Sequence, residues 1–145
     1  MFRALLLDQS ADGITAEVTE LDDDRLPDGD VTVAVEWSSL NYKDGMILKG
    51  LGRLVREYPH VPGIDLAGTV EESADPRFSP GDQVLLTGWR VGEVWWGGYA
   101  TRARVKGDWL TPVPAGMTTR QAMAVGTAGF TAMLAVDRLE HHGVS

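Results

Sequence analysis

Residues 26–37 read LPDGDVTVAVEW, and this stretch holds the pattern that decides the fold class. Its first half is typical of a turn, because Pro27 fixes φ and Gly29 accepts a positive φ. In its second half, apolar side chains occupy every other position, which is the period of a half-buried strand. These alternating residues are Val31, Val33, Val35 and Trp37. The stretch therefore predicts a tight turn that feeds a β-strand.

Strand patterns separated by Gly/Pro turns recur along the first hundred residues. They cover residues 14–20, 64–71, 83–87 and 99–106, and the chain also opens at its N-terminus in strand-like sequence. Many short strands joined by such turns are typical of a β-barrel or a sandwich. We therefore expect a mainly β body.

The last thirty residues change character from strand to helix. Thr118 and Gln121 have the spacing of a capping box, which predicts a helix start. Gly126 interrupts that helix, residues 127–142 continue as a second one, and Gly143 is a plausible stop. We expect residues 1–117 to form the β domain, and residues 118–145 to cross into a second domain absent from this chain.

Composition limits the classes of protein and of partner. The 145 residues suit about one domain, and 43% are hydrophobic, which is enough for a packed core. No cysteine is present, so disulfides and thiolate zinc sites are excluded. A net charge of −8 disfavours nucleic acid as a partner. With no apolar run of membrane-spanning length, we expect a soluble, cytoplasmic protein.

Most catalytic patterns are missing from the sequence. The three histidines, His60, His141 and His142, lack metal-ligand spacing and are interpreted as surface or capping residues. The acidic run at residues 22–24 is interpreted as a solvated turn. Neither a G-x-G-x-x-G phosphate loop nor a G-x-S-x-G nucleophile turn occurs.

One polar stretch, SSLNYKDG at residues 38–45, remains a candidate site. It follows the predicted strand at 31–37 and should open a short helix, and loops at strand ends often carry binding residues. On the pattern alone, a helix start with Asn41 or Asp44 as its cap is the favoured interpretation. The functional interpretation stays open beside it at this point.

Five motifs in order resemble the N-terminal catalytic domain of the medium-chain dehydrogenase/reductase superfamily. They are SLNYKD at 39–44, PGIDLAGTV at 62–70, GDQV at 81–84, GGYA at 97–100 and GTAGFTA at 126–132. The resemblance implies a chaperonin-10 (GroES)-like partial β-barrel with short helices. It also implies that the final helices lead to a Rossmann cofactor domain outside this chain.

The run VREYP at 55–59 and the stretch from 86 to 98 are similar to the zinc-free quinone oxidoreductase-like branch, especially its acrylyl-CoA reductases. In zinc-dependent relatives a cysteine would stand at Ser39 and a histidine at Ile64. Neither ligand is present, so the resemblance implies catalysis without zinc. Asp65, where those relatives keep an acidic residue, is expected to make a structural hydrogen bond.

The resemblance implies an NADPH-dependent oxidoreductase that reduces the activated C=C bond of an enoyl-CoA such as acrylyl-CoA. Asn41 and Tyr42 would lie beside the nicotinamide and the substrate, Tyr42 would be the hydrogen-bond donor, and Thr127 would touch the cofactor. The full-length protein would be a homodimer. Two alternatives stay open: a quinone or enone reductase of the same family, and a GroES-like binding module without enzymatic activity.

An acyl-CoA substrate is anionic, so local cations have to attract it to this acidic chain. Arg53, Arg56 and Arg90 are the candidate cations, and the hypothesis is that Arg56 or Arg90 contacts a CoA phosphate. A second set of cations, at alternate positions of one strand, is expected to be a solvated face: Arg102, Arg104 and Lys106. The tryptophans at 89, 95 and 96 could line a cleft or pack, and Gly63 and Gly68 are expected to meet backbone requirements.

Overall fold

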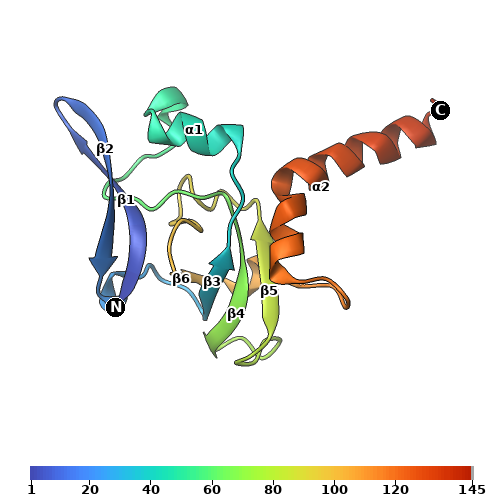
Figure 1. The fold of residues 1–145 in the computed structure, drawn as a ribbon, viewed down its shortest axis with the longest axis horizontal. Helices are drawn as coiled ribbons and strands as arrows, with labels where there is room; N and C mark the ends of the chain where they lie inside the picture. The colour runs from blue at the N-terminus through green and yellow to red at the C-terminus, as the bar shows by residue number, and fades with distance from the viewer. Residues whose placement is uncertain (145) are drawn as a thin grey trace.

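The computed structural model describes residues 1–144 and contains two sheets and two helices (Figure 1). The N-terminal hairpin pairs β1 (Phe2–Ser10) with β2 (Gly13–Leu21). The second sheet has the order β6-β3-β4-β5-β7. Its strands are β3 (Val31–Trp37), β4 (Asp65–Ser73), β5 (Gln83–Thr87), β6 (Arg102–Val105) and β7 (Thr111–Pro112). The helices are α1 (Tyr42–Leu48) and α2 (Thr119–His141), with single 3-10 turns η1 (Asp23–Arg25), η2 (Leu51–Arg53) and η3 (Gly107–Trp109).

The prediction of a mainly β body is confirmed, and strand 31–37 has the predicted bounds. The prediction for 99–106 was too long, because β6 begins only at Arg102. The preceding residues instead connect the two sheets: Tyr99 accepts a hydrogen bond from Leu5 at 2.8 Å, and Thr101 accepts one from Val35 at 3.0 Å. This crossing closes the strands into a partial barrel.

The core of the barrel consists of aliphatic side chains from the inner faces of β3, β4, β5 and β6. Among the fully buried ones are Val31, Val33, Leu66, Val84, Leu86 and Val105. Gly68 in β4 lies so close to β3 that an added Cβ would collide with the Ala34 carbonyl. Gly63 has φ 102°, and a Cβ there would lie 2.6 Å from the Tyr99 nitrogen. Both glycines meet the expected backbone requirements.

Helix α2 has the predicted start, interruption and stop. Gln121 donates its backbone N–H to Thr118 Oγ1 at 3.2 Å, and the Gln121 side chain accepts from the Thr118 N–H at 2.9 Å. Gly126 has φ 51° and ψ −165°, which breaks the helix, and Gly143 has φ 75° just after its end. The first half packs on Ala67 through Ala122 and Met123. In Figure 1 the second half projects away from the barrel. The domain boundary between 117 and 118 stays a prediction.

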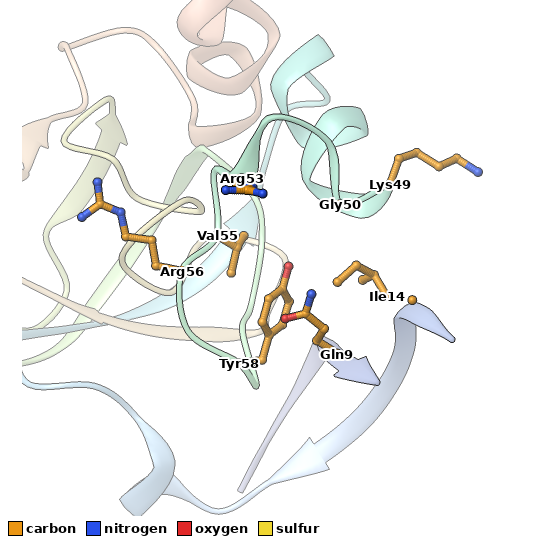
Figure 2. A pocket seen from close by; sticks show the side chains of 9 residues that line it. Gln9, Ile14, Lys49, Gly50, Arg53, Val55, Arg56 and Tyr58 are labelled. Carbon is orange, nitrogen blue, oxygen red and sulfur yellow. The ribbon is translucent and has the colours of Figure 1, made fainter. Parts of the chain in front are cut away.

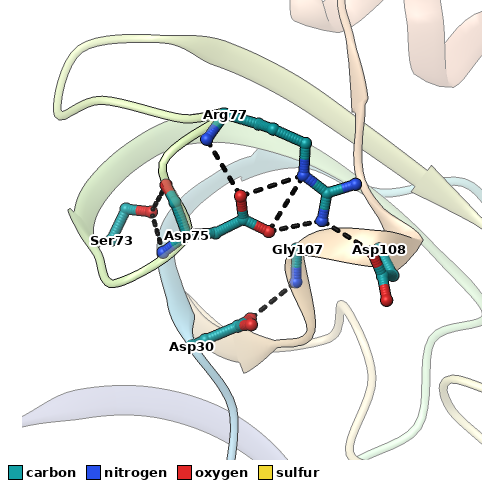
Figure 3. Close-up of polar contacts among 6 residues, drawn as sticks. All are labelled: Asp30, Ser73, Asp75, Arg77, Gly107 and Asp108. Carbon is teal, nitrogen blue, oxygen red and sulfur yellow. Dashed lines mark hydrogen bonds and ion pairs between the residues drawn. The ribbon is translucent and has the colours of Figure 1, made fainter.

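A carboxylate–guanidinium cluster ties together the loops at one end of the larger sheet (Figure 3). Asp75 accepts from the Arg77 backbone N–H and from its Nε, each at 2.9 Å. These contacts lower the pKa of Asp75 to about 2. Arg77 also pairs with Asp108 at 2.6 Å, and the Gly107 N–H donates to Asp30 at 2.6 Å. Segments from β3, β4 and η3 are thereby fixed to one another.

The basic strand face is solvated only in part: Lys106 is exposed as expected, whereas Arg102 and Arg104 are half-buried. Arg102 forms ion pairs with Glu71 at 2.6 Å and with Asp23 at 2.7 Å. Lys106 lies over the rings of Trp95 and Trp109, at 5.5 and 5.4 Å from their centroids. Acidic residues distant in sequence therefore pair with Arg102, two tryptophan rings contact Lys106, and Arg104 donates to Thr32 Oγ1 at 3.2 Å.

The acidic turn and the tryptophans also have structural partners. Asp23 pairs with the N-terminal amino group at 3.0 Å as well as with Arg102, and the amino group first and Arg102 second lower its pKa. Residues 22–24 form a largely exposed turn as interpreted, and Asp23 within it has two cationic partners that the pattern did not show. Trp89 stacks on Trp109, and Trp96 donates to the Pro59 carbonyl at 3.3 Å, so packing explains both rings.

His60 lies in the interior, contrary to the interpretation of it as a surface or capping residue. Its side chain is buried, and its Nε2 lies 2.8 Å from the Gly92 carbonyl oxygen. Its backbone bridges to Leu7 of β1, which explains why this loop is drawn inward. Burial lowers the pKa of His60, while the contact with Gly92 acts in the opposite direction. His141 and His142 are exposed at the end of α2, as expected.

Neither helix within residues 1–144 is both long enough and apolar enough to cross a membrane.

The close approach of β4 to β3 predicts that Gly68→Ala destabilises the sheet. Forcing a methyl group into a packed backbone contact should lower the free energy of unfolding by about 1–3 kcal/mol, measured by urea denaturation. Gly45→Ala is the matched control, because an added Cβ at Gly45 meets nothing within 4 Å. In helix α1 that substitution should raise stability by up to about 1 kcal/mol. Equal effects at the two positions would contradict the packing argument.

The buried His60 predicts a loss of stability in mild acid. Because burial lowers its folded-state pKa, the unfolded chain takes up a proton below the ordinary value of 6.5 that the folded chain resists. The free energy of unfolding should therefore fall between pH 7 and pH 5. His60→Gln, whose amide can still donate to Gly92, should flatten this fall, whereas the exposed control His141→Gln should keep it. An unchanged slope in His60→Gln would refute the prediction.

Candidate functional site

The buried carboxylate of Asp65, the first residue of β4, joins three separate segments of chain. It accepts from the Thr127 backbone N–H at 2.8 Å and from the Thr127 hydroxyl at 2.6 Å. It also accepts from the Asn41 amide at 3.1 Å and from the Ser39 hydroxyl in a short hydrogen bond. Asp65 is fully buried, so these four donors replace the water that its charge would otherwise bind. The expected structural role of Asp65 is thus more extensive than a bond within the strand.

Local sequence explains why these segments can meet. The Ser38 hydroxyl donates to the Asp65 carbonyl at 2.6 Å, which holds the end of β3 against the start of β4. Gly126 provides the space, because a Cβ there would lie 2.9 Å from both the Asp65 carboxylate and the Ser39 hydroxyl oxygen. Thr127 begins the second half of α2, whose first N–H groups need acceptors and whose dipole favours a negative charge. Asp65 meets both requirements from another part of the chain.

Asp44 plays a structural part at the start of α1. Its buried carboxylate accepts from the Asn41 backbone N–H at 2.9 Å and from the Ile64 N–H at 3.0 Å. It therefore caps the helix and fixes the residue before Asp65. Lys43 does not pair with Asp44 but with Glu93, at 2.9 Å.

The orientation of the Asn41 amide follows from its partners. Its Nδ2 donates to Ser39 Oγ at 3.0 Å and to Asp65 at 3.1 Å, so both N–H groups are used. A carboxylate can only accept, which excludes the flipped amide. The Asn41 Oδ1 is the acceptor side of the α1 capping box, toward the Asp44 N–H, and it keeps a second lone pair.

Asn41 and Tyr42 line one open, mostly apolar cavity of about 440 Å³. Leu40, Met46 and Leu51 supply most of its apolar wall. The Tyr42 side chain is 87% exposed, so its hydroxyl is accessible to a ligand. The structure thus brings Asn41 and Tyr42 together, and Asp65 connects Thr127 to Asn41. Their roles in binding remain predictions.

The structure separates the two candidate arginines. Arg56 lines a different cavity, of about 630 Å³, between the β1–β2 hairpin and the segment after α1 (Figure 2). Arg90 is not among the residues that line this cavity. It lies 3.7 Å from Glu93 and has φ 60° in the loop after β5.

Sequence reasoning missed Tyr99 as part of the site. Its hydroxyl donates to the Ser39 carbonyl at 3.2 Å. Burial first, and then the charges of Asp44 and Asp65, raise the pKa of Tyr99. The hydroxyl therefore stays protonated and supports the loop that carries Ser39 and Asn41. The GGYA motif marked the segment but not this long-range contact.

The donor set of the site does not suit a metal. Ser39 Oγ is already bonded to Asp65 and Asn41, and the side chain of Ile64 has no donor atom. Within the described 144 residues, no three His, Asp or Glu side chains gather in a way that could hold a metal ion.

A partial barrel that ends in a kinked helix, with a hydroxyl–amide–carboxylate cluster at their junction, defines a GroES-like domain of the alcohol dehydrogenase type. The sequence profile of the alcohol dehydrogenase GroES-like domain matches residues 27–115. The chain belongs to this family, within the medium-chain dehydrogenase/reductase superfamily, and the resemblance and the fold that it implies are confirmed.

Relatives match the whole chain but are longer. The acrylyl-CoA reductase AcuI of Ruegeria pomeroyi is 60% identical over 147 residues, which cover 100% of this chain and 44% of the relative. The Bacillus subtilis protein YhfP, whose provisional name is quinone oxidoreductase, is 46% identical over 100% of this chain and 44% of its own length. The solved structure of the Salmonella enterica yhdH oxidoreductase, in complex with NADP, has a TM-score of 0.95 and 58% identity. The match covers 98% of this chain and 44% of the chain in that structure. The chain therefore spans less than half the length of these relatives.

The Asp65 cluster predicts that Asp65→Asn loosens the second half of α2. Hydrogen bonds to a charged group contribute about 1.5–3 kcal/mol each, so losing the charge should lower the free energy of unfolding by about 2 kcal/mol. Hydrogen exchange at the Thr127 amide should become faster, because this N–H donates directly to Asp65.

Asp137→Asn is the matched control, since this carboxylate lies exposed on the same helix and its loss should change stability by less than about 0.5 kcal/mol. If the Thr127 amide exchanged equally slowly in Asp65→Asn and in the control, Asp65 would not be the group that holds this helix.

Proposed function

We propose that this chain is the substrate-side domain of an NADPH-dependent reductase that acts on the activated C=C bond of an enoyl-CoA, such as acrylyl-CoA. The observation that carries the proposal is the shared cavity of Asn41 and Tyr42, which Asp65 ties to the start of the second half of α2. The similarity to an acrylyl-CoA reductase over the whole chain supports the substrate class.

The residues at this site fit one edge of a nicotinamide. The Asn41 Oδ1 faces the Asp44 N–H in the capping box of α1, and its second lone pair can accept from a carboxamide N–H₂. When bound, the cofactor supplies the hydride that reaches the substrate β-carbon. The Thr127 N–H and hydroxyl both donate to Asp65, which leaves its methyl group and hydroxyl lone pairs for a contact with the cofactor. Since the chain lacks a G-x-G-x-x-G loop, the other phosphate and ribose contacts would come from outside these residues.

Tyr42 is the donor for the thioester carbonyl in this proposal. Reduction of the C=C bond places negative charge on the carbonyl oxygen, and a donor aimed at that oxygen stabilises it. Both Asn41 N–H groups are already used, so Asn41 cannot serve. The accessible Tyr42 hydroxyl can, and a proton then reaches the α-carbon to complete the reaction.

Two further parts of the proposal concern the whole protein. We infer from the family resemblance that the full-length protein forms a homodimer and works in the cytoplasm. Sedimentation of the full-length protein tests the first point, and its fractionation from cells tests the second.

Steady-state kinetics of the full-length protein with NADPH test the proposed reaction. We expect kcat/KM to be higher for acryloyl-CoA than for 1,4-benzoquinone. Tyr42→Phe should lower kcat for acryloyl-CoA about 100-fold, the typical effect of removing one donor to a developing oxyanion. Its KM for NADPH should change little. Trp89→Phe, an exposed aromatic that stacks on Trp109, is the control and should keep kcat.

The outcomes separate the candidate functions. A preference for the quinone would favour the second candidate, a quinone reductase, which the similarity to YhfP and the apolar wall of the Tyr42 cavity support. Reduction of neither substrate would favour a GroES-like binding module. An unchanged kcat in Tyr42→Phe would remove Tyr42 from the proposal.

A further inference from the structure

The largest cavity described above, of about 630 Å³, lies between the β1–β2 hairpin and the segment that follows α1 (Figure 2). Its polar lining comprises Gln9, Lys49, Arg53, Arg56 and Tyr58. Its volume is within the range of roughly 300–1,000 Å³ that is usual for small-molecule sites. The Asp65 cluster uses none of these side chains, and of the five only Arg56 was assigned a ligand from the sequence.

The charges around this cavity have one sign. Lys49, Arg53 and Arg56 line it, and no carboxylate does. None of the three forms an ion pair with a carboxylate anywhere in residues 1–144. By contrast, Arg77 and Arg102 each bind two carboxylates. In a chain of net charge −8, three unpaired cations at one cavity indicate that their partner is a ligand.

The acidic residues next to the cavity in sequence do not neutralise it. Asp8 precedes Gln9 in β1, and successive strand side chains point to opposite faces. Asp12 and Glu57 are exposed and are not among the lining residues.

The side chains are arranged for a large anion rather than a single small one. In Figure 2 the Tyr58 hydroxyl and the Gln9 amide lie close together near the middle of the cavity, with Arg53 above them. Lys49 and Arg56 line the cavity but extend outward in opposite directions, so their charged ends lie away from the Tyr58 hydroxyl, where only an extended ligand would meet them. Burial raises the pKa of Tyr58, which keeps its hydroxyl as a donor. The planar fork of an arginine and the ammonium group of a lysine are both suited to phosphate oxygens.

The position of the cavity relative to Tyr42 indicates what kind of anion it takes. Helix α1 begins at Tyr42 and ends at Leu48, and seven helical residues extend about 10 Å. The turn η2 borders both cavities, since Leu51 lines the Tyr42 cavity and Arg53 lines the cationic one. A ligand with its reactive end at Tyr42 could therefore place a phosphate-bearing end beside Arg53.

We propose that the cavity formed by Lys49, Arg53, Arg56, Gln9 and Tyr58 binds the phosphate groups of the coenzyme A part of the substrate. The choice of coenzyme A rests on the proposed function, whereas the affinity for a phosphorylated ligand rests on the cavity itself. Arg56 takes part in this site and Arg90 does not. This site holds the substrate far from the reacting bond, so it contributes to affinity and specificity rather than to the chemical step.

Calorimetric titration of the 145-residue chain tests the proposal without any turnover. Coenzyme A should bind, and pantetheine, which lacks the phosphates, should bind at least about tenfold more weakly. The phosphates of NADP are the other candidate ligand for these cations, so a competition titration compares the two. NADP should not displace coenzyme A at equal concentration. Raising the salt concentration should weaken the binding of coenzyme A, because screening reduces charge attraction.

Charge reversal identifies the residues. Arg53→Glu and Arg56→Glu should each weaken the binding of coenzyme A about tenfold and leave that of pantetheine unchanged. Arg138→Glu changes the net charge equally at an exposed position on α2 and should bind coenzyme A like the wild type. Circular dichroism of each variant, matching the wild type, shows that the fold is retained.

The proposal is overturned if coenzyme A and pantetheine bind equally, if NADP displaces coenzyme A from the cavity, or if all three variants bind coenzyme A alike. Its failure is distinct from that of the proposed function. Acryloyl-CoA reduction by the full-length protein without this binding would remove only the phosphate site. Binding as expected, with no reduction of any enoyl-CoA, would remove the reductase and leave the site.

Discussion

A buried carboxylate needs several hydrogen-bond donors, and the rest of the site depends on how the chain supplies them to Asp65. A charge removed from water loses its hydration, and only well-placed donors can compensate for that loss. Here the donors come from the loop between β3 and α1 and from the start of the second half of α2, while Asp65 itself begins β4. Satisfying the carboxylate therefore fixes the relative positions of these three segments. The site is a consequence of this requirement rather than an addition to a finished fold.

The same requirement decides what each polar group has left for a ligand. Asn41 gives both N–H groups to the cluster and keeps an oxygen, and Thr127 gives both of its donors. Tyr42 is outside the network and keeps its donor, with most of its side chain exposed. Because Asp65 and Ser39 take the N–H groups of Asn41, that side chain can offer a ligand only its oxygen as an acceptor. Because Asp65 does not contact Tyr42, the Tyr42 hydroxyl remains a donor.

Local sequence patterns correctly predicted the features that depend only on interactions between residues close in sequence. The alternation at 31–37, the capping box at Thr118 and the break at Gly126 each depend on residues within a few positions, and all three were found where expected. The cluster could not be derived in this way, because its members are far apart in sequence. The motif SLNYKD and the resemblance selected Asn41 and Tyr42, but only the fold shows that the Asn41 amide is turned toward Asp65.

The failures of sequence reasoning have the same origin. The residues around His60 predict an exposed loop. In the structure, a backbone bridge to Leu7 of β1 holds His60 in the interior. The alternation of cations in β6 predicts a solvated face, but in the structure Arg102 forms ion pairs with Glu71 and Asp23. In both cases a long-range partner, which no local pattern reports, determines the environment of the residue.

Hydrogen bonds hold the segments of this junction together, whereas in the zinc-dependent branch of the superfamily metal coordination would hold the corresponding segments. There, as the resemblance implies, a metal would join a cysteine at the Ser39 position to a histidine at the Ile64 position. Here the Ser39 hydroxyl reaches Asp65 directly, and the backbone of Ile64 is held by Asp44. Each hydroxyl or amide bond is weaker than a metal bond, but four of them converge on one carboxylate. Convergence of this kind fixes the loop before α1 by hydrogen bonds, while the cavity beside Tyr42 stays open and mostly apolar, which suits the apolar substrate proposed above.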